Sequence, residues 1–167
     1  MIKGRFEVRD IWFISDTHFC HEKIITHEKR PFSSVDEMDD VMMARWNEAV
    51  KPDDLIYHLG DITWRHSWLQ NLNKLNGTKR LMIGNHDSGK KCAPYFQQIQ
   101  LFRRFSDHGF MISHMPITSD QRREAVSVHG HTHGTDTNDP MNVNISAEKT
   151  GYAPLHLDDL LQLLPTI

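Results

Sequence analysis

The 167-residue sequence predicts a domain of the α/β class. Short runs of β-forming apolar residues alternate along the first half of the chain with segments whose apolar residues recur at helical spacing. Several of these runs end abruptly in polar residues, and in α/β proteins functional groups collect beyond the carboxyl ends of strands. No internal repeat or linker interrupts the pattern, so we expect one domain over residues 1–167.

The first apolar run, residues 11–15, predicts a buried strand that ends at Asp16 and His18. In extended backbone, residues two apart point to the same face, as a carboxylate and an imidazole must to share one cation. In isolation an Asx turn with an incidental histidine would be favoured for this tripeptide. His21 follows one turn later as a further candidate.

A helix is expected next, because Ser34 and Glu37 have the spacing of a capping box and apolar residues then recur at helical spacing to about residue 50. Residues 55–59 predict a second buried strand that leads to Gly60 and Asp61. His58 lies inside this strand and is interpreted as a core histidine whose nitrogens find partners.

The third strand, residues 80–83, leads to the motif Gly84-Asn85-His86-Asp87, and a helix-like segment closed by Gly77 precedes it. The segment 88–98 is open between helix and loop. Two later β-type runs also end in histidine, at His114 and at the pair His131 and His133. The remaining predicted elements are a strand at 141–145 and a closing amphipathic helix at 157–164 that Pro165 stops.

Composition limits the classes of function. The chain is 38% hydrophobic and 25% charged, and no apolar run is long enough to cross a membrane. The amino terminus has no signal-peptide core, which predicts a cytoplasmic protein. Cys20 and Cys92 form no paired motif, so free thiols are expected. The net charge of −3 argues against long nucleic acids as partners.

Twelve histidines, several beside aspartate, asparagine or glycine, direct attention to metal binding. Each strand-end motif is weak alone, but together they supply more ligands than one tetrahedral zinc ion takes. Two divalent cations that share a bridging carboxylate use them well. The mixture of imidazole, carboxylate and amide favours manganese, with iron, zinc or nickel also compatible. The candidate ligands are Asp16, His18, Asp61, Asn85, His114, His131 and His133.

In this order the motifs resemble those of the calcineurin-like metallophosphoesterase superfamily, and the opening Ser15-Asp16-Thr17-His18-Phe19-Cys20-His21 is similar to its small, cap-less bacterial and phage members. The resemblance implies a four-layer α/β/β/α sandwich with two facing mixed β-sheets. It also implies that Asp61 bridges the metals and that a bridging hydroxide attacks phosphorus in line. By the same analogy one metal is bound by Asp16, His18, Asp61 and His133, and the other by Asp61, Asn85, His114 and His131.

The resemblance makes His86 the catalytic residue, which would stabilise the transition state or protonate the leaving oxygen. Arg65 and His21 are the candidate substrate-binding residues, although Arg65 is equally compatible with a solvated loop charge. Trp64 stands where the protein phosphatase branch has aspartate, which argues against that activity. Trp64 would either offer an aromatic face to a nucleotide base or be buried together with Trp68.

The expected reaction is hydrolysis of a phosphomonoester or phosphodiester, with a nucleotide ester as one candidate substrate. A nuclease acting on DNA or RNA is one alternative. A non-catalytic metal-binding scaffold of the same fold is another. The sequence does not predict the oligomeric state.

Overall fold

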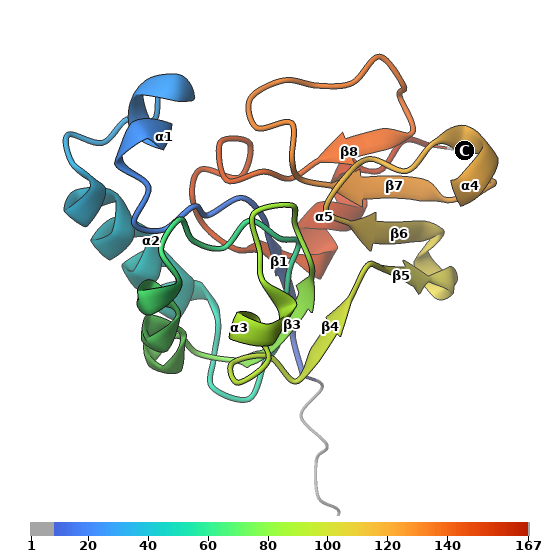
Figure 1. Cartoon of the computed structure of the whole chain (residues 1–167). Coiled ribbons are helices and arrows are strands. Elements are labelled where there is room, and N and C mark those ends of the chain that lie inside the picture. The colour runs from blue at the N-terminus through green and yellow to red at the C-terminus, as the bar shows by residue number, and fades with distance from the viewer. Residues whose placement is uncertain (1–8, 167) are drawn as a thin grey trace, which may run out of the picture.

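The computed structural model describes residues 9–166 (Figure 1). Residues 1–8 and 167 lie outside the described part. The predicted domain of residues 1–167 includes all of them. The cytoplasmic prediction depends on the amino-terminal segment, which includes residues 1–8. Within the described part, the strands form two mixed sheets with flanking helices, which confirms the predicted fold class. No helix in residues 9–166 is long and apolar enough to cross a membrane.

The first sheet contains the strands that carry the first three polar motifs. Its four parallel strands and the antiparallel β9 are arranged in the order β4, β3, β2, β1 and β9. Parallel pairing puts the carboxyl ends of β1, β2 and β3 at one edge, so their motifs start from neighbouring positions. The strands are β1 (Ile11–Ile14), β2 (Leu55–His58), β3 (Thr78–Met82), β4 (Gln98–Gln100) and β9 (Leu155–His156).

The second sheet delivers the histidine motifs. Its order is β5, β6, β7 and β8, with β5 antiparallel to β6 and the other pairs parallel. An isolated bridge between Ser15 and Ser146 joins the chain beyond β1 to the chain beyond β8. The strands are β5 (Phe102–Phe105), β6 (Phe110–Ser113), β7 (Val126–His129) and β8 (Asn142–Asn144).

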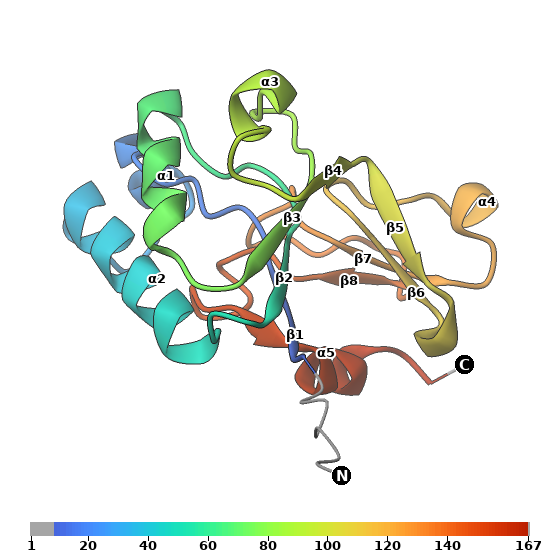
Figure 2. The ribbon, with the colours of Figure 1, turned by 90° about the horizontal axis from the view of Figure 1, so that it is seen from below.

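Helices cover one face of the first sheet, as Figures 1 and 2 show. They are α1 (Glu22–His27), α2 (Val35–Ala49) and the 3₁₀ helix η1 (His66–Lys74). Helix α5 (Leu157–Leu163) continues directly from β9 and contacts β1. Three short pieces complete the chain: α3 (Gly89–Cys92), η2 (Ser106–His108) and α4 (Ser119–Arg122).

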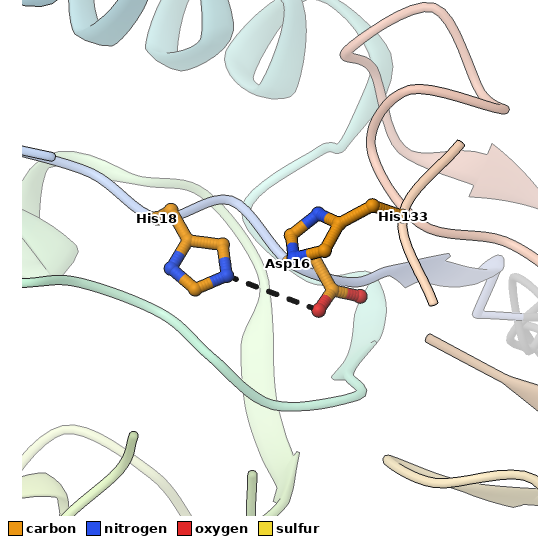
Figure 3. A group of neighbouring side chains, drawn as sticks. All are labelled: Asp16, His18 and His133. Atoms are coloured by element: carbon orange, nitrogen blue, oxygen red, sulfur yellow. Dashed lines mark ion pairs between the residues drawn. The ribbon is translucent and has the colours of Figure 1, made fainter. Parts of the chain in front are cut away.

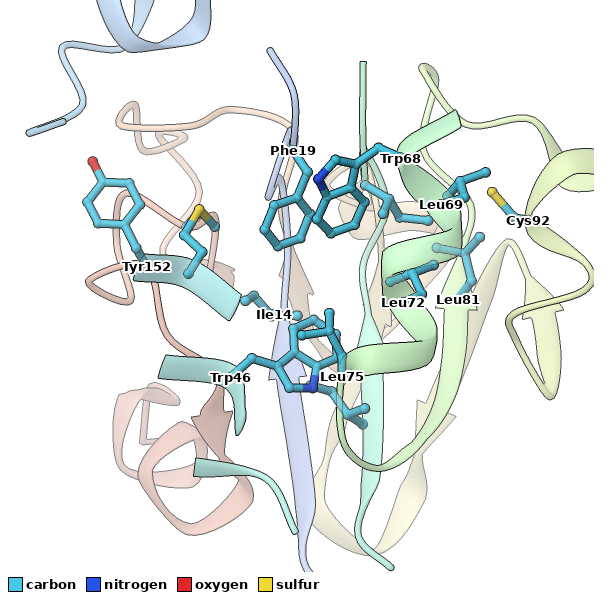
Figure 4. Close-up of a cluster of buried hydrophobic side chains, with 14 of the residues drawn as sticks. Ile14, Phe19, Trp46, Trp68, Leu69, Leu72, Leu75, Leu81, Cys92 and Tyr152 are labelled. Carbon is cyan, nitrogen blue, oxygen red and sulfur yellow. The ribbon is translucent and has the colours of Figure 1, made fainter. Parts of the chain in front are cut away.

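Two apolar cores hold these layers together. The first lies between the helices and the first sheet, where Trp46 of α2 and Leu72 of η1 pack with Ile14 and Leu81 (Figure 4). The second contains Phe13 and Tyr57 of the first sheet together with residues of the second sheet and Leu160 of α5. Because both cores are built on β1 and β2, the strand ends that carry polar motifs are fixed by packing on both faces.

Most predicted elements are present. Ser34 caps α2 by accepting the backbone N–H of Glu37, and α5 ends before Pro165, both as predicted. The helix-like segment after Trp64 is a 3₁₀ helix that begins at His66. The open segment 88–98 holds only the short helix α3 before β4. The sequence did not predict β4, β5, β9, α1 or α4, because short edge strands and single helical turns carry too little apolar periodicity.

Candidate metal centre

Five strand ends meet on one side of the molecule. The polar residues that follow β1, β2, β6 and β7 form two groups of three, and within each group the potential ligand atoms lie within 4.8 Å of one another. Asn85, after β3, contacts the second group. The first group is Asp16, His18 and His133 (Figure 3), and the second is Asp61, His114 and His131.

The backbone at these positions is left-handed, which corrects the expectation of extended backbone. Asp16 and His18 have φ values of 54° and 47°, and Asp61 has 56°. His131 and His133 have 67° and 49°, so five of the nine non-glycine residues with positive φ in residues 9–166 are site residues. Such conformations are sparsely populated, and they persist only where surrounding contacts hold them.

The H-x-H pair also behaves differently from the same-face expectation. The imidazole of His133 lies in the first group and that of His131 in the second. The backbone N–H of His131 donates to both carboxylate oxygens of Asp16, at 3.1 and 2.9 Å. This contact holds the backbone of His131 beside Asp16, and the two histidine side chains each contribute a ligand atom to a different group.

In the first group, the buried ring of His18 lacks partners. Both of its nitrogens are buried without a hydrogen bond in the described structure, and Nε2 lies 4.0 Å from Asp16 Oδ1. Burial, followed by the nearby His133, lowers the pKa of His18 to about 2, so the ring is neutral at pH 7. Burial likewise raises the pKa of Asp16. Because buried polar atoms rarely stay unpaired, this group fits a cation between its side chains.

In the second group, the tautomer of His114 follows from its neighbours. Its Nδ1 lies 2.8 Å from the carbonyl oxygen of Leu59, and a carbonyl only accepts, so Nδ1 carries the proton. Its Nε2 lies 2.9 Å from Asn85 Oδ1 and 3.2 Å from His131 Nδ1. Potential ligand atoms of three side chains therefore converge at this point. The second group therefore fits a metal as well.

Asp61 lies between the two groups. Its Oδ2 is 3.6 Å from His18 Nε2 and 3.5 Å from His114 Nε2. The other oxygen, Oδ1, accepts the backbone N–H of His86 at 2.9 Å. One carboxylate oxygen thus faces an imidazole of each group, which is the placement that a bridging ligand needs.

Glycine is required where the loops cross. A Cβ built at Gly84 would overlap the Asp61 carboxylate, and one built at Gly130 would overlap the side chains of Ser15 and Asp16. Gly84 therefore permits a close backbone approach to Asp61 that a side chain would block.

Three residues of the site had no predicted role. Asp87 accepts backbone N–H groups from Asp61 and Gly84 at 2.9 Å and from Ile62 at 3.0 Å, and so fixes the loop that carries Asp61. Its place in the motif Gly84-Asn85-His86-Asp87 was the only available signal.

The other two are Arg30 and Glu148, which are 118 residues apart and form a buried ion pair of 2.7 Å. Arg30 also donates to the carbonyl oxygens of Asp16 and Thr17. Glu148 Oε1 lies 3.2 Å from His133 Nδ1. Burial opposes the charged form of His133, but the Glu148 and Asp16 carboxylates outweigh it and raise the pKa. Nothing in the sequence connects these two residues, because only the fold brings them together.

His58 has the core role that the sequence predicted. Gly60 N–H donates to its Nδ1 at 3.1 Å, so Nε2 carries the proton and donates to Thr17 Oγ1 at 2.9 Å. Thr17 in turn donates to the carbonyl oxygen of Ile62. Burial lowers the pKa of His58 to about 3. This chain of hydrogen bonds ties the loop after β1 to the loop after β2.

The proposed catalytic and substrate-binding residues border the two groups. The exposed ring of His86 has its centroid 5.6 Å from those of His18 and Trp64, and its Nε2 lies 3.9 Å from Asp61 Oδ2. His21 contacts Trp64 at a centroid distance of 4.2 Å. His21, Trp64 and Arg65 line a hollow of about 190 Å³.

The structure also decides between the two interpretations of Trp64. Trp68 is buried and stacks on Phe19 at 3.9 Å, whereas Trp64 is 53% exposed. Burial of Trp64 together with Trp68 is therefore wrong. The physical reason is that η1 begins only at His66, so the two tryptophans are not neighbours on one face of an α-helix.

Comparison with known proteins decides the family. The model of the calcineurin-like phosphoesterases matches residues 9–163, which include both groups and His86. The chain belongs to this family. The sequence resemblance is thereby confirmed, and the phosphoesterase family implies metal-dependent action on phosphoesters.

Relatives of this chain come from archaea, phages and bacteria. An uncharacterized protein of Methanocaldococcus jannaschii, MJ1445, is 32% identical over 94% of this chain and 92% of its own length. The Gene 66 protein of Mycobacterium phage L5 is 26% identical over 73% of this chain and 76% of its own. The crystal structure of AQ665, a protein of unknown function from Aquifex aeolicus, superposes with a TM-score of 0.76 and 28% identity, covering 94% of this chain and all of that one.

Proposed function

We propose that this protein binds two divalent cations and hydrolyses a phosphomonoester or phosphodiester, with a nucleotide ester as one candidate substrate. The observation that carries the proposal is the position of Asp61 Oδ2, between Nε2 of His114 and the unpartnered ring of His18. The inter-sheet core built on β1 and β2 supports treating the chain as one domain.

The first cation would be held by Asp16, His18 and His133, and the second by Asn85, His114 and His131, with Asp61 shared between them. Manganese is our first candidate, because the donors mix imidazole nitrogen with carboxylate and amide oxygen, and iron, zinc and nickel fit the same donors. When bound, two such cations would offset the charge of phosphoryl oxygens and would lower the pKa of a water molecule at the site.

The chain's own residues then hold and protonate the substrate. His86 is near Asp61 without belonging to either group, and its exposed ring faces solvent. We assign it proton donation to the leaving oxygen, or stabilisation of the charge that develops there. Asp61 Oδ1 holds the backbone of His86 and so couples its position to the metal centre. Arg65 and His21 border the substrate from the neighbouring hollow.

The test is metal content together with hydrolysis of bis(4-nitrophenyl) phosphate, before and after chelation and after manganese is restored. We expect about two metals per chain, loss of turnover on chelation and recovery on readdition. Undiminished turnover by metal-free protein would refute the proposal. A protein that holds metals but hydrolyses none of a panel of nucleotides, cyclic nucleotides and oligonucleotides would instead be a metal-binding scaffold.

A further inference from the structure

A second hollow adjoins the proposed metal ligands. It is a groove of about 540 Å³ whose lining includes Asn85 and His114 together with the apolar side chains of Leu101, Phe102 and Met115. This volume is in the range of small-molecule sites. The groove shares no lining residue with the hollow beside Trp64, so the site has two separate recesses.

The apolar side chains of this groove are unusually exposed. Five large apolar residues are exposed in residues 9–166, and three of them line this one groove. Leu101 is 72% exposed, Phe102 57% and Met115 48%. Contiguous exposed apolar surface is characteristic of a binding site, because leaving it in water is unfavourable.

The fold brings these side chains to the metal centre. Phe102 begins β5 and lies opposite Ser113, the last residue of β6, directly before the proposed ligand His114. Ser113 Oγ donates to the carbonyl oxygen of Met115 at 2.6 Å, which fixes the turn that carries Met115. The apolar walls are therefore set by the same strand that places His114.

The charge of the groove limits its ligand. The lining contains no lysine, arginine, aspartate or glutamate, so a further phosphate on the substrate would find no cation there. A neutral apolar or aromatic group would instead bury the exposed side chains.

We propose that the groove binds the apolar or aromatic substituent that stays on phosphorus when a phosphodiester is hydrolysed. This inference rests on the proposed function, in which His86 protonates the leaving oxygen. His86 lies beside Trp64 and not among the groove residues, so the leaving group occupies that side and the retained substituent the other. A monoester has no retained substituent and leaves the groove empty.

The test uses three substrates that release the same product: 4-nitrophenyl phosphate, methyl 4-nitrophenyl phosphate and phenyl 4-nitrophenyl phosphate. For the manganese-loaded protein, we expect kcat/KM for the phenyl diester to exceed that for the methyl diester by about tenfold, as burial of one ring predicts. Phe102→Ala should abolish most of this preference. Leu101→Ala should reduce it too.

Leu163→Ala is the matched control, because Leu163 is also an exposed apolar residue but does not line the groove. It should leave both diesters unchanged. An unaltered phenyl-to-methyl ratio in Phe102→Ala and Leu101→Ala would overturn the inference alone. If the phenyl-to-methyl ratio is unaltered and light scattering shows a dimer for the wild type but a monomer for these two variants, the groove is an interface between copies of the chain. No turnover of any of the three esters would overturn the proposed function and this inference with it.

Discussion

Replacement of Asp87 by asparagine tests whether the metal centre depends on the loop that carries Asp61. The Asp87 carboxylate accepts three backbone N–H groups, two at Oδ2 and one at Oδ1. An asparagine of the same shape keeps one acceptor oxygen and presents an NH₂ group in place of the other. If it keeps the bonds to Asp61 and Gly84, the buried N–H of Ile62 faces another donor.

The size of the stability change follows from the hydrogen bond that Ile62 N–H loses in Asp87→Asn. A buried donor left unpaired costs about 1–3 kcal/mol, and the two remaining bonds lose the assistance of a charge. Burial raises the pKa of Asp87, and the nearby Asp61 charge also raises it, whereas the backbone hydrogen bonds lower it. Desolvation therefore offsets part of what the ionised carboxylate contributes. We expect a loss of about 2 kcal/mol in the free energy of unfolding, which corresponds to about 4–8 °C in Tm.

The assay is thermal and urea unfolding of metal-free Asp87→Asn, followed by metal titration of the folded variant. Metal affinity should fall about 10–100-fold, as is typical when a residue that orients a ligand is changed. The control is Asp136→Asn, which removes an exposed carboxylate paired with Lys149 and should change stability by less than about 0.5 kcal/mol. Wild-type stability combined with wild-type metal affinity in Asp87→Asn would refute the positioning role.

Three further substitutions separate the other assigned roles. Asp61→Ala should lower metal loading more than a change at any other ligand, because both groups lose a shared carboxylate; two metals per chain by elemental analysis would show that Asp61 is no bridge. His86→Ala should keep the metals and lower turnover by about 10²–10⁴-fold, with a smaller loss for nitrophenyl than for alkyl esters; equal losses would leave only charge stabilisation. Trp64→Ala should raise KM for a nucleotide ester and spare a small aryl phosphoester, whereas equal impairment of both would remove Trp64 from substrate binding.

The sequence predicted the side chains that form the two groups, but not Asp87, Arg30 or Glu148. Asp16 and Asp61 follow apolar runs that become the parallel neighbours β1 and β2, so the pattern of runs predicts that they lie together. His114 follows a strand of the second sheet, and its approach to them depends on how the sheets pack. The alternation of such runs with helical segments predicted the α/β class, and the capping-box spacing of Ser34 and Glu37 predicted α2 with its cap. These features are local, because strand and helix periodicity is written in neighbouring residues.

Only the tertiary structure decided which of the gathered residues belong to the first group and which to the second. His131 and His133 enter different groups because left-handed backbone, held by the Asp16 carboxylate, turns them apart. The Arg30 and Glu148 pair meets across 118 residues, and the exposed groove around Phe102 depends on the register of β5 against β6. Such contacts form when the sheets pack, and the residues that make them are too far apart in the sequence for a local pattern to predict them.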